Sequence, residues 1–179
     1  MMKERLKQPI FICGMMGTGK SVVGKKIAGK LNLPFHDLDL LIEAEAGMKI
    51  PEIFEIRGES YFRALEKKIL EGFAGSEPGV LALGGGSLQN QEITNAVKSN
   101  GILIFIDTDT DILVNRLRSN NNRPLIKNLN QKELRMKIES LLKDRRPFYS
   151  QAHITVHSGR NPADEIAERI LEKLDDYDL

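Results

Sequence analysis

At positions 14 to 21 the chain reads Gly14-Met15-Met16-Gly17-Thr18-Gly19-Lys20-Ser21, which matches the pattern G-x-x-x-x-G-K-[ST]. An apolar run at Ile10-Phe11-Ile12-Cys13 precedes this stretch, and an amphipathic pattern with Val23, Ile27 and Leu31 follows it. Glycines let backbone N–H groups approach phosphate oxygens without an intervening Cβ, and the following helix directs its positive end at the same anion. The stretch therefore predicts a phosphate-binding P-loop between a strand and a helix, with a purine nucleoside triphosphate as its ligand.

Two side chains of this loop suit a nucleotide and its metal ion. Lys20 is expected to contact the β and γ phosphates, and the Ser21 hydroxyl is expected to bind Mg²⁺. The residues of the loop expected to bind the nucleotide are Gly14, Gly17, Thr18, Gly19, Lys20 and Ser21. The alternative is a glycine-rich turn without a ligand, but the Lys-Ser pair and both flanks argue against it.

Composition bounds the class of protein. A length of 179 residues suits one domain, spanning residues 1–179, and the 41% of hydrophobic and 28% of charged residues are typical of a globular chain. The net charge is +1, so we expect no binding to nucleic acid or to an anionic membrane, and we favour a monomer. The one cysteine, Cys13, excludes an intrachain disulfide. No signal pattern or long apolar span is apparent, and we expect a cytoplasmic protein.

Short apolar runs alternate with amphipathic segments along the whole chain. The expected strands are 10–13, 34–37, 80–83, 102–106 and 154–156. The expected helices are 20–31, about 40–47, 51–58, 59–74, 91–99, 108–118, 131–144 and a last helix with Asn161 as its cap and Pro162 at its first position. This alternation predicts an α/β fold, with a five-stranded parallel sheet covered by helices on both faces in three layers.

Candidate ligand-binding residues follow two of these strands. Asp37-Leu38-Asp39 comes after the second strand, and Gly84-Gly85-Gly86 comes after the third. Open α/β sheets bind ligands at the carboxyl ends of their strands, so we expect Asp39 to lie toward a substrate and the glycines to allow close approach by a ligand. The alternatives are that one or both aspartates cap the next helix and that the glycines form a plain turn.

Residues 119–130 are rich in residue types that favour turns, and they show no amphipathic period. A loop of this length in a compact domain is often a lid or a binding loop, and this one contains Arg123. We expect a lid, with a passive surface loop as the alternative.

Three classes of protein with a P-loop are considered. A nucleotide switch of the GTPase type should contain N-K-x-D, and the nearest segment, Asn161-Pro162-Ala163-Asp164, lacks the lysine. A nucleic-acid-associated ATPase should show a basic face or a longer chain, and the balanced charge argues against one. A small-molecule kinase is therefore favoured.

The order of motifs resembles that of the shikimate kinases, within the nucleoside monophosphate kinase group of P-loop folds, from Ile10 to about Leu174. The matching segments are Gly14 to Ser21, Asp37-Leu38-Asp39, Phe62-Arg63 with Glu66, Gly84-Gly85-Gly86, Arg123-Pro124-Leu125 and Arg145-Arg146-Pro147-Phe148-Tyr149. Leu38 stands where the family usually has threonine, but both aspartates remain.

The resemblance implies ATP-dependent phosphorylation of the 3-hydroxyl of shikimate to shikimate 3-phosphate, in the route to chorismate and the aromatic amino acids. By similarity, Arg63 and Arg145 hold the substrate carboxylate, and Asp39 binds the reacting hydroxyl as orienter or base. Gly85 and Gly86 contribute backbone N–H groups to the same pocket.

The resemblance also implies roles at the nucleotide. Ser21 and, through water, Asp37 hold Mg²⁺, while Lys20 and Arg123 neutralise the transferring phosphoryl group. Arg116 and Pro162 pack against the adenine base. A related small-molecule kinase, such as a gluconate kinase, is the alternative, because it shares the P-loop and also acts on a polyhydroxy carboxylate.

Overall fold

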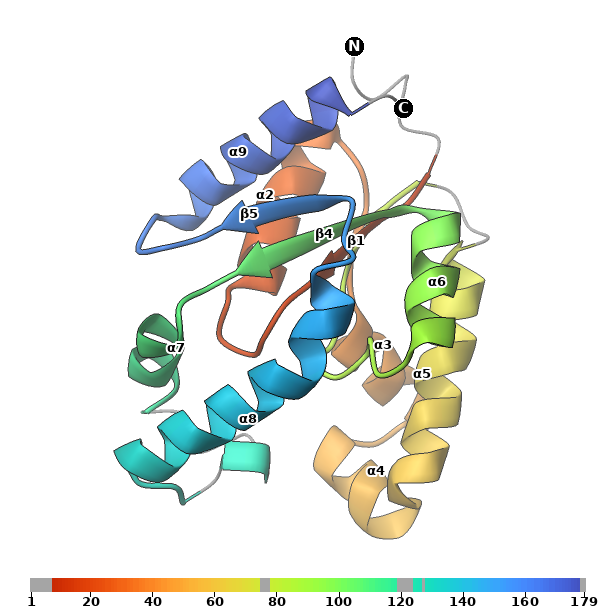
Figure 1. Cartoon of the computed structure of the whole chain (residues 1–179). Coiled ribbons are helices and arrows are strands. Elements are labelled where there is room, and N and C mark those ends of the chain that lie inside the picture. Colours follow the sequence, from red (N-terminus) through yellow and green to blue (C-terminus); the bar gives the residue numbers. More distant parts are fainter. Residues whose placement is uncertain (1–7, 75–77, 119–123, 127, 178–179) are drawn as a thin grey trace.

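A computed structural model describes residues 8–74, 78–118, 124–126 and 128–177. Its centre is a five-stranded parallel sheet with the strand order β2-β3-β1-β4-β5 (Figure 1). The strands are β1 (Ile10–Cys13), β2 (Phe35–Asp37), β3 (Val80–Ala82), β4 (Ile102–Asp107) and β5 (Ile154–His157). The expected five-stranded parallel sheet is confirmed.

Helices connect every pair of consecutive strands. They are α2 (Lys20–Leu31), α3 (Leu38–Ala46), α4 (Ile50–Ile56), α5 (Gly58–Ala74), α6 (Gln91–Asn100), α7 (Thr110–Leu117), α8 (Gln131–Tyr149) and α9 (Ala163–Asp176), with a short 3₁₀ turn at Pro124–Ile126. Among the described residues, no helix is both long and apolar enough to cross a membrane.

The central strand β1 is buried on both faces, as its continuous apolar sequence requires. Ile10 and Ile12 pack with the apolar stripes of α2 and α9 on one face of the sheet. Phe11 and Cys13 point to the opposite face, where α3, α5 and α6 cover the sheet. Figure 1 shows α2 beside α9 and, away from them, α3, α5 and α6, so the three-layer arrangement is confirmed.

In a third apolar cluster, the P-loop packs against α7 and α8. Met15 and Met16, which follow the first glycine of the loop, are buried against residues of both helices. Ile126, in the 3₁₀ turn, is buried in the same cluster. Part of the segment predicted as a structureless loop is thus anchored to the core, while residues 119–123 and 127, including Arg123, lie outside the described part of the chain.

Several predicted boundaries differ from those in the structure, among them one in each of α8, α9 and α3. Helix α8 continues past 144 to Tyr149 with Pro147 inside it, because the proline falls in the last turn and the Ser150 N–H still donates to the Arg146 carbonyl at 2.9 Å. Helix α9 starts at Ala163 with Pro162 as its cap, one residue later than expected. Helix α3 starts at Leu38, directly after its cap Asp37.

Candidate active site

The P-loop and the glycine triplet lie at the carboxyl ends of two neighbouring strands. The P-loop follows β1, and the triplet follows β3, which pairs with β1 in parallel. The chain leaves β1 toward β2 on one side of the sheet and leaves β3 toward β4 on the other side. In open parallel sheets, ligands bind at such a switch in direction, so the region around these two loops is the candidate active site.

The P-loop has the backbone conformation that its glycines permit. Gly14, Gly17 and Gly19 have φ angles of 144°, 83° and 92°, and a Cβ on Gly14 would lie 2.7 Å from the carbonyl oxygen of Ile106. The Lys20 ammonium donates to the carbonyl oxygens of Gly14 and Met15, at 3.0 and 3.1 Å. Its positive charge is therefore held at the loop where a phosphate chain is expected.

Thr18 is buried within the loop. Its hydroxyl has no hydrogen-bond partner among the residues that the structure describes. A buried hydroxyl without a partner is rare, because leaving it unpaired costs free energy. The backbone of Thr18 lies in the turn that the motif assigns to phosphate, and its N–H donates to the Met15 carbonyl at 3.3 Å.

Ser21, in the first turn of α2, meets Asp37 at the end of β2. The Ser21 hydroxyl donates to Asp37 Oδ2 at 2.5 Å, while Asp37 Oδ1 accepts the Asp39 N–H at 3.1 Å as the cap of α3. The suggestion that an aspartate caps this helix is thus correct for Asp37, which in addition contacts the expected metal-binding hydroxyl. One hydroxyl and one carboxylate suit Mg²⁺, which keeps several water and phosphate ligands. The described residues contain no cluster of three or more His, Cys, Asp or Glu side chains that could form an all-protein metal cage.

Charged side chains from three helices converge on the glycine triplet. A Cβ on Gly84 would lie 2.9 Å from Asp39 Oδ1, and a Cβ on Gly85 would lie 3.2 Å from Arg145 Nη1. A Cβ on Gly86 would lie 3.4 Å from Arg145 Nη2 and 3.5 Å from an Arg63 nitrogen. The absence of side chains on the triplet therefore lets one carboxylate and two guanidinium groups gather around its backbone.

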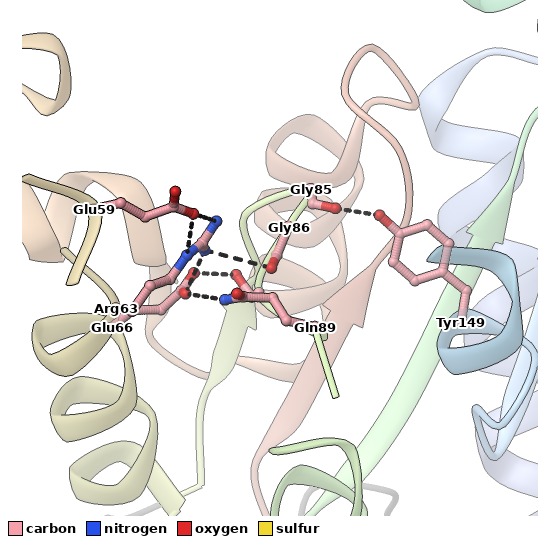
Figure 2. Close-up of polar contacts among 8 residues, drawn as sticks. Glu59, Arg63, Glu66, Gly85, Gly86, Gln89 and Tyr149 are labelled. Carbon is pink, nitrogen blue, oxygen red and sulfur yellow. Dashed lines mark hydrogen bonds and ion pairs between the residues drawn. The ribbon is translucent and has the colours of Figure 1, made fainter. Parts of the chain in front are cut away.

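Arg63 is oriented by acidic side chains of its own helix. Its Nη1 donates to Glu66 Oε2 at 2.8 Å and to the carbonyl oxygen of Gly86 at 3.4 Å, and Glu59 accepts from its Nε and Nη2 at 3.3 Å (Figure 2). The Glu66 side chain is 3% exposed, whereas that of Glu59 is 65% exposed. The buried carboxylate is therefore the structural anchor of Arg63.

Two residues that the sequence did not single out complete this anchor. The Ser87 hydroxyl donates to Glu66 Oε1 at 2.7 Å, and the Gln89 side chain donates to Oε2 at 3.0 Å. Ser87 follows the glycine triplet directly and Gln89 comes two residues later, and polar side chains at that point were the signal that could have drawn attention to them.

The neighbouring arginines of α8 point in different directions. Arg145 is half-buried at the triplet, with Nη1 3.5 Å from the Met15 sulfur, whereas Arg146 is exposed and pairs with Asp107 at 3.0 Å. Successive residues of a helix are rotated by about 100°, so the helix directs the two side chains to different sides. The structure places the Arg145 side chain at the site and directs that of Arg146 away from it.

The residues expected at adenine lie on separate elements. Arg116, near the end of α7, donates to the carbonyl oxygen of Gly17 at 3.1 Å, and Pro162 caps α9. An open hollow of about 500 Å³ lies between the start of α7 and the connection from β5 to α9, with Asp109 and Arg160 in its lining. Neither Arg116 nor Pro162 lines this hollow.

The family model for shikimate kinase matches residues 16–175 of the chain. A shikimate kinase from Bartonella quintana (strain Toulouse) is 39% identical over 171 residues, which cover 96% of this chain and 80% of the relative. The solved structure of shikimate kinase from Acinetobacter baumannii in complex with shikimate superposes with a TM-score of 0.88 at 32% identity, over 96% of this chain and 95% of that one. A gluconokinase from Sinorhizobium meliloti shares the fold, with a TM-score of 0.61 at 20% identity over 96% of this chain and 94% of that one. The family match and the similarity along nearly the whole sequence lead to one conclusion: this chain belongs to the shikimate kinase family.

Proposed function

We propose that this protein transfers the γ-phosphoryl group of ATP to the 3-hydroxyl of shikimate, forming shikimate 3-phosphate. The observation that carries the proposal is the convergence of Asp39, Arg63 and Arg145 on the glycine triplet, one strand away from the P-loop. Family membership supports ATP as the phosphoryl donor and an alcohol as the acceptor. The candidate site therefore has a phosphate half and an acceptor half.

The phosphate half consists of the P-loop with Lys20, Ser21 and the backbone around Gly17. Phosphoryl transfer develops negative charge on the transferring group, and a preorganised cation stabilises that charge in the transition state. Lys20, already held against the loop carbonyls, supplies this charge, and we assign the same role to Arg123. Arg116, which already contacts the P-loop carbonyl of Gly17, and Pro162, the cap of α9, are proposed to hold adenine.

The acceptor half suits a hydroxylated carboxylate. A guanidinium binds a carboxylate with two parallel hydrogen bonds, and two arginines around one backbone segment give that recognition a defined direction. Asp39 adds an acceptor for a substrate hydroxyl, which it orients or deprotonates as that oxygen attacks phosphorus. Gly85 and Gly86 provide backbone N–H donors, because no side chain blocks approach to them.

Magnesium is proposed to bind at Ser21, with Asp37 holding one of its water ligands. The 2.5 Å hydrogen bond between the two side chains shows that both oxygens reach the same point at the end of the P-loop. When bound, Mg²⁺ neutralises charge on the phosphate chain. Because Asp37 is also the cap of α3, it fixes the start of the helix that bears Asp39.

We also propose a domain organisation, an oligomeric state and a lid for this chain. Residues 1–179 are proposed to form one kinase domain that works as a monomer in the cytoplasm, with 119–130 closing over the site as a lid. Closure would exclude water, which competes with the acceptor hydroxyl for the phosphoryl group. Light scattering during size-exclusion chromatography measures the oligomeric state, and proteolysis between 119 and 130 should slow when ATP and shikimate are both present.

An ADP-release assay against shikimate, gluconate and AMP tests the proposed reaction. We expect the highest kcat/KM with shikimate, a loss of activity when Mg²⁺ is chelated, and a fall of about 1,000-fold in kcat for Lys20→Ala. Higher kcat/KM with gluconate would overturn the assignment of the acceptor. Unchanged turnover in Lys20→Ala would overturn the role of the P-loop lysine.

A further inference from the structure

Tyr149, in the last turn of α8, has no role in the proposed reaction above, yet it contacts the site. It is 1% exposed, and its ring lies against Phe105 with the centroids 5.1 Å apart. Its hydroxyl donates a hydrogen bond to the carbonyl oxygen of Gly85, as Figure 2 shows. Burial raises the pKa of this phenol, against the opposing effect of Arg145, so the hydroxyl keeps its proton and remains a donor.

This hydrogen bond determines the direction of the next N–H group. The Gly85 carbonyl and the Gly86 N–H belong to one peptide group, and in a trans peptide they point in opposite directions. The described chain contains no cis peptide bond. A carbonyl held toward Tyr149 on α8 therefore directs the Gly86 N–H away from that helix.

The carbonyl of Gly86, the third residue of the triplet, is held from the opposite side. Arg63, on α5, donates to the carbonyl oxygen of Gly86 at 3.4 Å (Figure 2). Gly86 thus lies between two hydrogen bonds from two different helices, and a glycine backbone left without them has unusually wide conformational freedom. Tyr149 is the partner on the α8 side.

Tyr149 also lies one helical turn after Arg145, on the same face of α8. We propose that Tyr149 is a positioning residue of the acceptor site, whose hydroxyl holds the Gly85–Gly86 peptide in register with the Arg145 guanidinium. This inference rests on the proposed function, because that function assigns Gly86 and Arg145 to the shikimate molecule. Tyr149 acts through these groups and does not itself need to touch the substrate.

The substitution Tyr149→Phe tests the inference, because it removes the hydroxyl and keeps the ring that packs against Phe105. We expect KM for shikimate, and the Kd for shikimate measured by calorimetry without nucleotide, to rise about 3- to 10-fold, the effect of one lost hydrogen bond. KM for ATP should stay within about 2-fold of the wild-type value. A purely structural role would lower the melting temperature and leave the ratio of the two KM values unchanged.

Tyr177→Phe is the matched control, since it removes a hydroxyl from a tyrosine whose ring lies beside His153, beyond the end of α9. We expect wild-type values of both KM for this variant. An unchanged shikimate KM in Tyr149→Phe, or an equal rise in both KM values, would overturn the inference. Failure of the wild-type protein to phosphorylate shikimate would instead overturn the proposed function, so the two failures are distinct.

Discussion

The substitution Glu66→Gln removes one negative charge from the buried anchor of Arg63 and changes almost no volume. Glu66 Oε2 accepts from Arg63 and Gln89, and Oε1 accepts from Ser87. The glutamine oxygen can replace Oε2, and the Ser87 hydroxyl can turn to accept from the new amide. What changes is the charge on the acceptor of Arg63 and the presence of a second amide hydrogen in a buried site.

These two changes set the expected size of the effect. A hydrogen bond to a charged group is worth about 1 kcal/mol more than a neutral one, and a buried donor without a partner costs about 1–3 kcal/mol. The expected loss is therefore about 2–4 kcal/mol in the free energy of unfolding, or roughly 5–15 °C in melting temperature for a chain of this size. Arg63, held by a neutral oxygen in place of a carboxylate, is ordered less firmly, and ordering it on substrate binding costs about 1 kcal/mol, which raises KM for shikimate roughly 5-fold.

Glu59→Gln provides the control, because Glu59 contacts the same guanidinium from an exposed position. Exposed ion pairs contribute little, so we expect a change of less than about 2 °C in melting temperature and a nearly unchanged KM. Differential scanning fluorimetry and the ADP-release assay measure both quantities. Equal effects of the two substitutions, or no effect of Glu66→Gln, would refute the argument that burial makes Glu66 the anchor of Arg63.

Three further predictions concern Arg145, Gly84 and Cys13. Arg145→Ala should raise KM for shikimate at least about 10-fold with little change in KM for ATP, whereas Arg146→Ala should leave both within about 2-fold; similar losses in the two variants would contradict the separation of their side chains. Gly84→Ala should lower kcat/KM for shikimate at least about 10-fold, because its Cβ would lie 2.9 Å from a carboxylate oxygen of the site, while Gly29→Ala, with no atom within 4 Å of the new Cβ, should raise the melting temperature slightly. Burial raises the pKa of the Cys13 thiol, so less of it is thiolate at pH 8, and iodoacetamide should label the native protein at least about 100-fold more slowly than the protein in guanidinium; comparable rates would mean that β1 is not buried.

The expectations that depended on local patterns were mostly confirmed. The apolar run at 10–13 and the amphipathic run at 20–31 form β1 and α2 with the predicted bounds, because hydrophobic periodicity and turn glycines act over a few residues. The predicted end of α8 was wrong because a local signal and the packing of the core disagree there. Pro147 signals a helix stop locally, but burial of Tyr149 in the core favours continuation of the helix.

Sequence patterns predicted only part of the candidate site. The pairing of Glu66 with Ser87 and Gln89 joins a helix to a loop more than twenty residues away, and no periodicity encodes such a contact. The same is true of Met15 and Met16, which anchor the P-loop between α7 and α8. The roles of the individual site residues, including Arg123 outside the described part of the chain, stay predictions until the variants are measured.

By itself, the sequence determined the P-loop, the alternation of strands and helices, and the kinase family through the order of its motifs, because each of these is written in residues close together along the chain. The tertiary structure decided which loops face each other. The strand order β2-β3-β1-β4-β5 brings the ends of β1 and β3 together, and the packing of α8 places Arg145, which the motif had already indicated, at the triplet. Both outcomes depend on the packing of distant segments, in which burial of apolar faces selects one arrangement of the elements that local patterns leave open.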